Sequence, residues 1–179
     1  GESGHAAREE GVNAIYLAIE DIHWFQQYQF PKQSKFLGPI KMSVTMIEAG
    51  SQHNVVPASC KFVVDVRTTD VYNNEEVLDI IKNNVQCKVQ ARSTRLNPST
   101  IAVEHPIVQA GQKLGKKVYG SPTMSDQALL PIPSLKVGPG DSARSHAADE
   151  FIYVQEIADG IHFYINILSE LIKIDNKID

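Results

Sequence analysis

The order of the helical and strand-like segments predicts an α+β protein whose first half is a ferredoxin-like split βαβ unit. Apolar residues recur at helical intervals in two segments and alternate with polar residues in three others. In chain order these are a helix at 11–28, strands at 39–49 and 54–68, a helix that begins at Asn73, and a strand at 86–96. This order lacks only the first strand of the unit, which we expect immediately before Gly1.

The first helix is expected to bury one apolar face. That face repeats every three or four residues through Ile15, Ala18, Ile19, Ile22 and Phe25. The polar residues that fall outside it, and are expected on the exposed side, are Asn13, Glu20, Asp21 and Gln26. Pro31 closes the helix, because a proline disfavours helical backbone at the residue before it.

The two strands that follow are expected to alternate between a buried and an exposed face. In the first, the apolar face is Met42, Val44 and Met46, and the polar face is Lys41, Ser43 and Thr45. In the second, the apolar face is Cys60, Phe62, Val64 and Val66, and the opposite face is Lys61, Val63, Asp65 and Arg67. Pro57 interrupts the second strand near its start, so the alternation is not extended back to Asn54.

The second helix and the last strand complete this half. Asn73 and Asn74 are cap candidates, and the two glutamates that follow place acid in the first turn. The apolar stripe of the helix is Val77, Leu78 and Ile81. In the strand at 86–96, one face is Cys87, Val89 and Ala91, and the other is Lys88, Gln90 and Arg92.

The second half, from residue 98, mixes helices with very short strands. The expected elements are a helix from Pro106 to Gly115, strands at 117–119 and 134–137, a loop at 138–146, and a helix at about 150–173. The last helix carries an apolar stripe of Ile157, Ile161, Tyr164, Ile165, Leu168 and Leu171. These strands are too few to form a sheet of their own.

Composition and charge exclude several classes of function. Among 179 residues, 17 Lys and Arg against 21 Asp and Glu give a net charge of −4, and a nucleic-acid binder would need a basic surface. No apolar run reaches the roughly 18–20 residues that cross a bilayer. The two cysteines, Cys60 and Cys87, lie in apolar runs and are interpreted as buried thiols in a reducing compartment, hence a cytoplasmic protein.

Three residues are candidates for chemistry, each with a simpler alternative. His146 lies in a Gly- and Ser-rich loop before a helix, where it is either a metal ligand or a cap. Arg67, beside Asp65, is either half of a surface ion pair or a guanidinium fork for a carboxylate. His5 is either a hydrogen-bond donor or an exposed turn residue. The chain has no HxD or HExxH motif to complete a zinc site.

Four ordered blocks then resemble a known family over essentially the whole chain. They are Gly1–Arg8 with Gly11–Ile15, Asn54–Ala58 with Val64–Arg67, Ser121–Asp126, and Gly138–Gly140 with Ser145–Ile152. The sequence resembles the di-zinc amidohydrolases that include acetylornithine deacetylase and succinyl-diaminopimelate desuccinylase. Within that family it is most similar to the acetylornithine deacetylase-like branch of Bacteroidetes, some members of which prefer N-succinylornithine.

The resemblance implies a role for six residues and a division of the chain. Residues 1–97 would be a lid and dimerisation domain, and residues 98–179 the C-terminal part of an α/β zinc-hydrolase catalytic domain. His5 would stabilise the oxyanion in the partner's site. The other implied roles are substrate binding for Asn54 and Arg67, shaping of the loop beside the scissile amide for Gly138 and Gly140, and zinc ligation for His146.

The implied function is hydrolysis of the amide bond of an N-acyl amino acid, of the N-acetyl- or N-succinylornithine type, in arginine biosynthesis. The resemblance implies two zinc ions, or cobalt or manganese, and a homodimer. It also implies a longer chain, because the remaining metal ligands and the general base have no match after Gly1. The 179 residues alone are then expected to be inactive and to bind no metal tightly. Two alternatives stay open: a dipeptidase of the same family, and a non-catalytic dimerisation or small-molecule-binding module.

Overall fold

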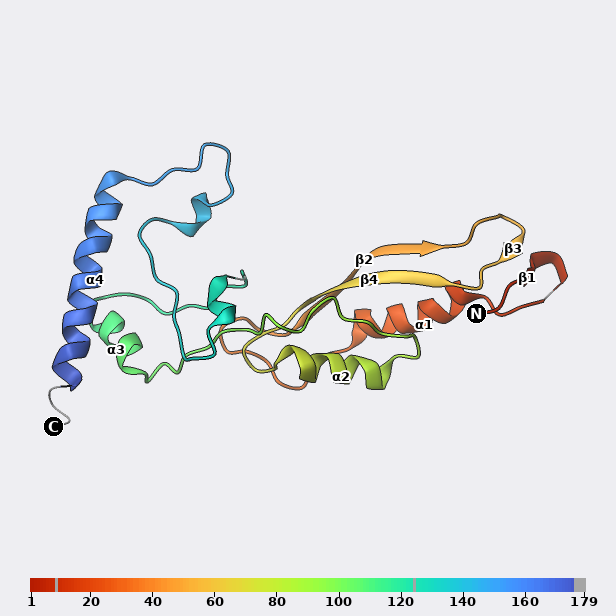
Figure 1. Cartoon of the computed structure of the whole chain (residues 1–179), viewed down its shortest axis with the longest axis horizontal. Helices are drawn as coiled ribbons and strands as arrows, with labels where there is room; N and C mark the ends of the chain where they lie inside the picture. The colour runs from red at the N-terminus through yellow and green to blue at the C-terminus, as the bar shows by residue number, and fades with distance from the viewer. Residues whose placement is uncertain (9, 124, 176–179) are drawn as a thin grey trace. The chain divides into compact units, whose positions relative to one another are not determined.

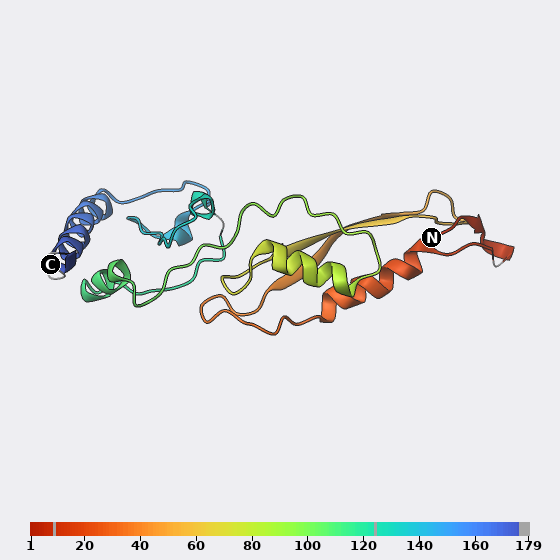
Figure 2. The same ribbon diagram turned by 60° about the horizontal axis from the view of Figure 1, so that its bottom comes forward.

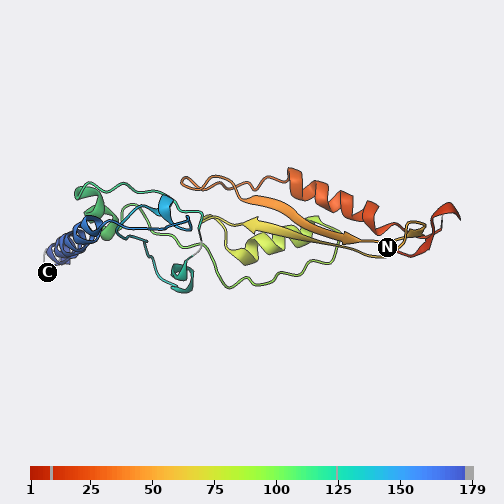
Figure 3. The ribbon, with the colours of Figure 1, turned by 90° about the horizontal axis from the view of Figure 1, so that it is seen from above.

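A computed structural model describes residues 1–8, 10–123 and 125–175 of the chain; Met124, in one of the four sequence blocks, lies outside them. The chain divides into two compact units, which we treat separately. Unit 1 consists of Gly1–Pro98 with Ser121–Met124, and unit 2 of Ser99–Gly120 with Ser125–Asp179. Figures 1, 2 and 3 show the ribbon from three directions.

Unit 1 contains the predicted helices and two small antiparallel sheets. Its elements are β1 (Gly4–His5), the short 3-10 helix η1 (Ala6–Arg8), α1 (Ala14–Gln27), β2 (Lys41–Ala49), β3 (Val55–Val56), β4 (Cys60–Arg67) and α2 (Asn74–Asn84). One sheet pairs β1 with β3, and the other pairs β2 with β4. Both helices lie against the same face of the β2–β4 ribbon (Figure 1). The α+β prediction is confirmed.

The core of unit 1 lies between this ribbon and its two helices. Phe25 of α1 and Val77 and Ile81 of α2 are buried in one cluster, against which the apolar face of β4 packs. α2 begins with a capping box: the Asn73 side chain accepts from the Glu76 backbone N–H, and the Glu76 carboxylate accepts from that of Asn73. The cap prediction for Asn73 is therefore confirmed.

The buried face of α1 differs from the predicted one. Its buried residues are Ala14, Ala18, Asp21 and Phe25, whereas Ile19 is 53% exposed. Asp21, predicted to be exposed, is buried because its two carboxylate oxygens accept the backbone N–H groups of Gln86 and Cys87, both at 2.9 Å. A carboxylate with two such partners can leave water without losing its hydrogen bonds.

We expect Asp21→Asn to lower the free energy of unfolding by about 1–3 kcal/mol, because an amide offers one acceptor oxygen and turns N–H groups toward a backbone donor. Chemical denaturation followed by circular dichroism measures the change. Glu20→Gln on the exposed side of α1 is the matched control and should leave stability within about 0.5 kcal/mol. Equal stability of the two variants would contradict the proposed contribution of the Asp21 hydrogen bonds to the free energy of unfolding.

A β-bulge breaks the strict alternation predicted for β2. The register shifts between Val44 and Met46, so Val44 pairs with Val64 but Met46 pairs with Val63. An extra residue in one strand moves the side chains after it to the other face. Met46, predicted on the buried face with Met42 and Val44, is therefore on the opposite face and 67% exposed. The face assignments of β4 are confirmed, including Arg67 on the exposed side.

The strand predicted at 86–96 does not form. Cys87 and Val89 are partly buried and their neighbours exposed, as the alternation predicts, and Val89 packs against the core of unit 1. A strand also needs a hydrogen-bonded partner. Within the described residues the segment pairs with no other strand, so it stays extended without a ladder.

Unit 2 is held together by two helices and a long loop. α3 (Pro106–Lys113) begins at His105, whose side chain accepts from the Ile107 N–H, and α4 (Val154–Asp175) is the long C-terminal helix. Two short 3-10 helices, η2 (Asp126–Leu129) and η3 (Ser142–Arg144), lie between them. The strands predicted at 117–119 and 134–137 do not form, because these segments find no partner strand in the described chain.

The apolar stripe predicted on α4 is largely exposed. Ile167, which is not part of that stripe, is buried, and a side chain added at Gly111 of α3 would touch it. The exposed members of the predicted stripe are Ile157, Ile161, Tyr164, Ile165 and Leu168. A wide apolar surface of α4 therefore has no cover within the described residues. None of the described helices is long and apolar enough to span a membrane.

Candidate functional site

His5 and Asn54 lie next to each other at one corner of unit 1. β1 pairs with β3 so that His5 is opposite Val55, and the Ala6 N–H donates to the Asn54 carbonyl at 3.1 Å. Both side chains are exposed. Residues that are far apart in the sequence thus form one polar corner, which we call the His5–Asn54 corner.

The ring of His5 is oriented by its own turn. Its Nδ1 accepts the Ala7 backbone N–H at 3.2 Å. In a neutral imidazole one nitrogen accepts and the other carries the proton, so this contact places the proton on Nε2. The exposed edge of His5 is therefore a hydrogen-bond donor.

Close backbone packing supports the same corner. A Cβ added at Gly4 would lie 2.3 Å from the Glu10 carbonyl oxygen, and one added at Gly11 would lie 2.6 Å from the Glu2 oxygen. Both approaches are far inside van der Waals contact, so only glycine fits at these positions. This packing fixes the backbone of β1, which lies in the first sequence block.

Arg67 lies at the other end of the β2–β4 ribbon. β4 runs from Cys60, next to β3, to Arg67 at its end. The steps of about 3.3 Å between its successive residues place its two ends about 23 Å apart. Figure 1 shows the ribbon extending away from β1 and β3. The structure therefore brings His5 and Asn54 together but keeps Arg67 apart from them. The Arg67 Nε donates to the Asp65 carboxylate at 2.7 Å, and both side chains are exposed.

The remaining predicted site residues lie in one loop of unit 2. Gly138 is surrounded by open space, and Gly140 has a φ of +86° that favours glycine. His146 is exposed and has a φ of +60°, in the left-handed region that non-glycine residues rarely adopt. The Glu150 carboxylate accepts the backbone N–H of His146 at 3.1 Å, so this hydrogen bond does not use the ring nitrogens of His146.

The described residues supply one candidate metal ligand and no metal centre. Nowhere in the described ranges do three His, Cys, Asp or Glu residues gather closely enough to hold an ion. His146 fits a single ligand position, because an exposed imidazole is a common ligand of zinc. The carboxylate of Glu150 faces the backbone of His146.

Two features of the structure were missed from the sequence. The first is the burial of Asp21, which was assigned to the exposed side; nothing local to α1 indicates its long-range partners. The second is an ion pair between Arg144 and Glu156, for which the spacing of Tyr153 and Glu156 at a helix start was an available signal.

The Cys87 thiol lies beside the Asp21 carboxylate. Burial, with the nearby Asp21 carboxylate as a smaller cause, raises the pKa of the Cys87 thiol to about 11, so this thiol stays protonated near neutral pH.

The chain is similar to a known family and to enzymes of known name. The sequence profile of a family described as "Peptidase dimerisation domain" (M20_dimer) matches residues 1–91. An acetylornithine deacetylase from Proteus mirabilis is 26% identical over 173 residues, covering 85% of this chain and 44% of that protein. A succinyl-diaminopimelate desuccinylase from a Ruegeria species is 28% identical over 88 residues, covering 48% of this chain and 22% of that protein.

A solved structure shares the fold. Aminopeptidase PepT from Bacillus cereus superposes with a TM-score of 0.60 at 21% identity, covering 94% of this chain and 48% of PepT. The chain thus spans less than half the length of these relatives. The similarity to Bacteroidetes proteins in particular stays a prediction.

Proposed function

We propose that this chain, which belongs to the M20 peptidase dimerisation family, is part of a longer enzyme that hydrolyses the amide bond of an N-acyl amino acid. The substrate class is N-acetyl- or N-succinylornithine, and the role is in arginine biosynthesis in the cytoplasm. The observation that carries the proposal is the His5–Asn54 corner, where the pairing of β1 with β3 brings the backbones of His5 and Asn54 close together and both side chains are exposed. The similarity to an acetylornithine deacetylase over 85% of the chain supports it.

In this proposal His5 donates from Nε2 to the oxygen of the amide carbonyl as negative charge develops on it. A positioned donor of this kind typically contributes about 3–4 kcal/mol to the transition state. The Asn54 amide binds a polar group of the same substrate, and Arg67 binds the substrate carboxylate. Two zinc, cobalt or manganese ions, when bound, supply a water of lowered pKa and polarise the carbonyl. Of the described residues, only His146 is proposed as a ligand, and the others would come from the rest of the longer chain.

The separation within unit 1 supports a homodimer. An N-acyl amino acid is shorter than the roughly 23 Å length of β4, so the His5–Asn54 corner and Arg67 of one chain cannot contact the same substrate molecule. We propose that a second copy resolves this, in a two-fold dimer whose axis sets the corner of one chain beside the Arg67 end of the other. The name of the matched family agrees with association through unit 1.

We expect Tyr16→Glu combined with Ile19→Glu to weaken the dimer about 100-fold or more, because both exposed apolar side chains lie on one face of α1 and the symmetry places each charge in the interface twice. Analytical ultracentrifugation of the full-length protein measures the association constant. Ile132→Glu, at an exposed position of unit 2, is the matched control. An unchanged association constant in the double variant would exclude this face of α1 from the dimer.

The uncovered face of α4 supports the proposal that a longer chain completes the fold. Its exposed isoleucines and leucine belong to the apolar stripe that the sequence predicts on this helix. A soluble domain seldom leaves so continuous an apolar stripe in water. We propose that the rest of the catalytic domain covers it, which is also why the 179 residues alone are expected to be inactive.

The test is hydrolysis by the full-length protein supplied with Zn²⁺. Release of acetate or succinate from N-acetyl- and N-succinylornithine is measured beside a panel of dipeptides, under identical conditions. Faster hydrolysis of the acyl amino acids supports the proposal, and faster hydrolysis of dipeptides favours a dipeptidase of the same family. No hydrolysis of either class would overturn the enzymatic proposal.

A non-catalytic dimerisation module is the second candidate. It is favoured by the lack of any three-ligand cluster in the described ranges and by the match of the dimerisation family to residues 1–91. In that case the full-length protein would dimerise without binding zinc tightly. Metal analysis after gel filtration distinguishes the two candidates.

A further inference from the structure

We propose that Arg144 and Glu156 form a clamp that fixes the conformation of the His146 loop, residues 145–150, and that both are positioning residues for His146. The inference rests on the proposed function, in which His146 binds metal. Arg144 precedes the loop, and Glu156 lies in the first turn of α4 after it.

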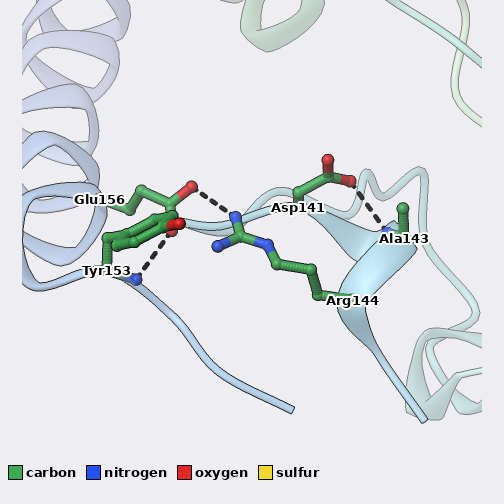
Figure 4. Close-up of polar contacts among 5 residues, drawn as sticks. All are labelled: Asp141, Ala143, Arg144, Tyr153 and Glu156. Carbon is green, nitrogen blue, oxygen red and sulfur yellow. Dashed lines mark hydrogen bonds and ion pairs between the residues drawn. The ribbon is translucent and has the colours of Figure 1, made fainter. Parts of the chain in front are cut away.

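The clamp consists of the Arg144 guanidinium, the Glu156 carboxylate and the rings of Phe151 and Tyr153. Figure 4 shows Arg144, Tyr153 and Glu156. The Arg144 Nη2 donates to Glu156 Oε1 at 2.5 Å, and the second oxygen, Oε2, accepts the Tyr153 backbone N–H at 2.9 Å. The Arg144 Cζ lies 4.9 Å from the ring centre of Phe151 and 5.3 Å from that of Tyr153. One carboxylate therefore caps α4 and holds Arg144, while the rings cover the guanidinium.

This pair differs from an ordinary surface ion pair. The Arg144 and Glu156 side chains are 19% and 30% exposed, whereas Lys173, which pairs with Glu170 later in α4, is 68% exposed. Solvent screens exposed pairs strongly and partly buried pairs less. Cation–π contact with two rings adds to the attraction between Arg144 and Glu156.

The segment before Arg144 is also fastened along α4. The Tyr164 hydroxyl donates to the Val137 carbonyl at 2.8 Å. Pro139 packs on Gly160, where an added Cβ would lie 2.9 Å from the proline Cβ, so only glycine allows this approach. The segment thus enters the His146 loop from a fixed position.

The loop itself needs such support. His146 and Asp149 both have positive φ angles, of 60° and 59°. Left-handed backbone at non-glycine residues persists only where the surroundings over-determine it, and it occurs preferentially at functional sites. Arg144 on one side of the loop and Phe151, Tyr153 and Glu156 on the other close its two ends together.

The experiment uses the full-length protein with Arg144→Gln, Glu156→Gln and the double variant, and with Lys173→Gln as the control on the exposed pair. Hydrogen exchange of the 145–150 amides and the zinc affinity, from competition with a chelator, are measured. Each single clamp variant is expected to speed exchange and weaken zinc binding, both on the order of tenfold. The double variant is expected to resemble the singles, because the two residues act through each other.

Two outcomes would overturn the clamp while the proposed function stands: exchange as slow as in Lys173→Gln, or additive losses in the double variant. Faster exchange with unchanged zinc affinity would overturn the positioning role. If the wild-type full-length protein neither binds zinc nor hydrolyses an acyl amino acid, the proposed function fails and the positioning role with it, while the exchange rates still decide whether the clamp holds the loop.

Discussion

His5→Ala in the full-length protein should lower kcat for an N-acyl amino acid by about 100- to 1,000-fold and leave KM nearly unchanged. The reason is that the donor contributes mainly when charge develops on the carbonyl oxygen, not when the neutral amide binds. The Nδ1 contact with the Ala7 N–H keeps the proton on Nε2, so the wild-type ring is already in the donating form.

Steady-state kinetics of acetate or succinate release measure this effect. His162→Ala is the matched control, since His162 is exposed on α4 and belongs to no proposed site. His5→Gln, which keeps an N–H donor at a similar reach on a more flexible side chain, should retain part of the activity. Equal kinetics for His5→Ala and the wild type would remove the donor role from His5.

Mixing two inactive variants tests whether His5 acts in the partner's site. A dimer of His5→Ala with His146→Ala has one site in which His146 belongs to one chain and His5 to the other. With random exchange, half of the dimers are mixed and each has one complete site, so about a quarter of the wild-type activity should return. No recovery after confirmed subunit exchange would mean that His5 serves its own chain.

Local patterns predicted the two helices and the long ribbon of unit 1, but not the contacts between segments that are far apart in the sequence. The helices α1 and α2 and the faces of β4 follow from periodicity and caps. Met46 was misplaced because a bulge depends on the partner strand, which periodicity within β2 does not reveal. Asp21 was misplaced because the backbone groups that allow its burial come from residues 86 and 87.

The strand expected at 86–96 also shows that local periodicity does not reveal contacts with distant segments. Alternation fixes which side chains face the core, and that part is present at Cys87 and Val89. Strand formation depends in addition on a neighbour, and residues 86–96 have none among the described strands. On α4, likewise, the apolar pattern shows that a face can be buried but not which element buries it.

The sequence named individual candidate residues but not how they are arranged. The sequence blocks pointed to His5, Asn54 and Arg67, but only the pairing of β1 with β3 shows that the first two are neighbours. Only the course of β4 shows that Arg67 is remote from them. The structure therefore shows what the blocks do not: the residues proposed to bind substrate lie at two separate ends of unit 1.

Arg67→Ala should raise KM for the acyl amino acid about 100-fold with a smaller change in kcat, because it removes the guanidinium proposed to bind the substrate carboxylate. The present contact leaves that role open to Arg67, since the Asp65 carboxylate accepts from Nε and the side chain is 68% exposed. Arg67→Lys keeps the charge but not the planar fork, so its KM should be intermediate. Asp65→Ala is the matched control and should change KM far less.

A substrate without a carboxylate separates binding from structural damage. The methyl ester of N-acetylornithine should be a poor substrate for the wild type, with a KM close to that of Arg67→Ala for the acid. The same ester should lose nothing further in Arg67→Ala, because the variant and the ester remove two halves of one contact. If the ester and the substitution instead had additive effects on KM, Arg67 would act on the fold of β4 and the carboxylate would bind elsewhere.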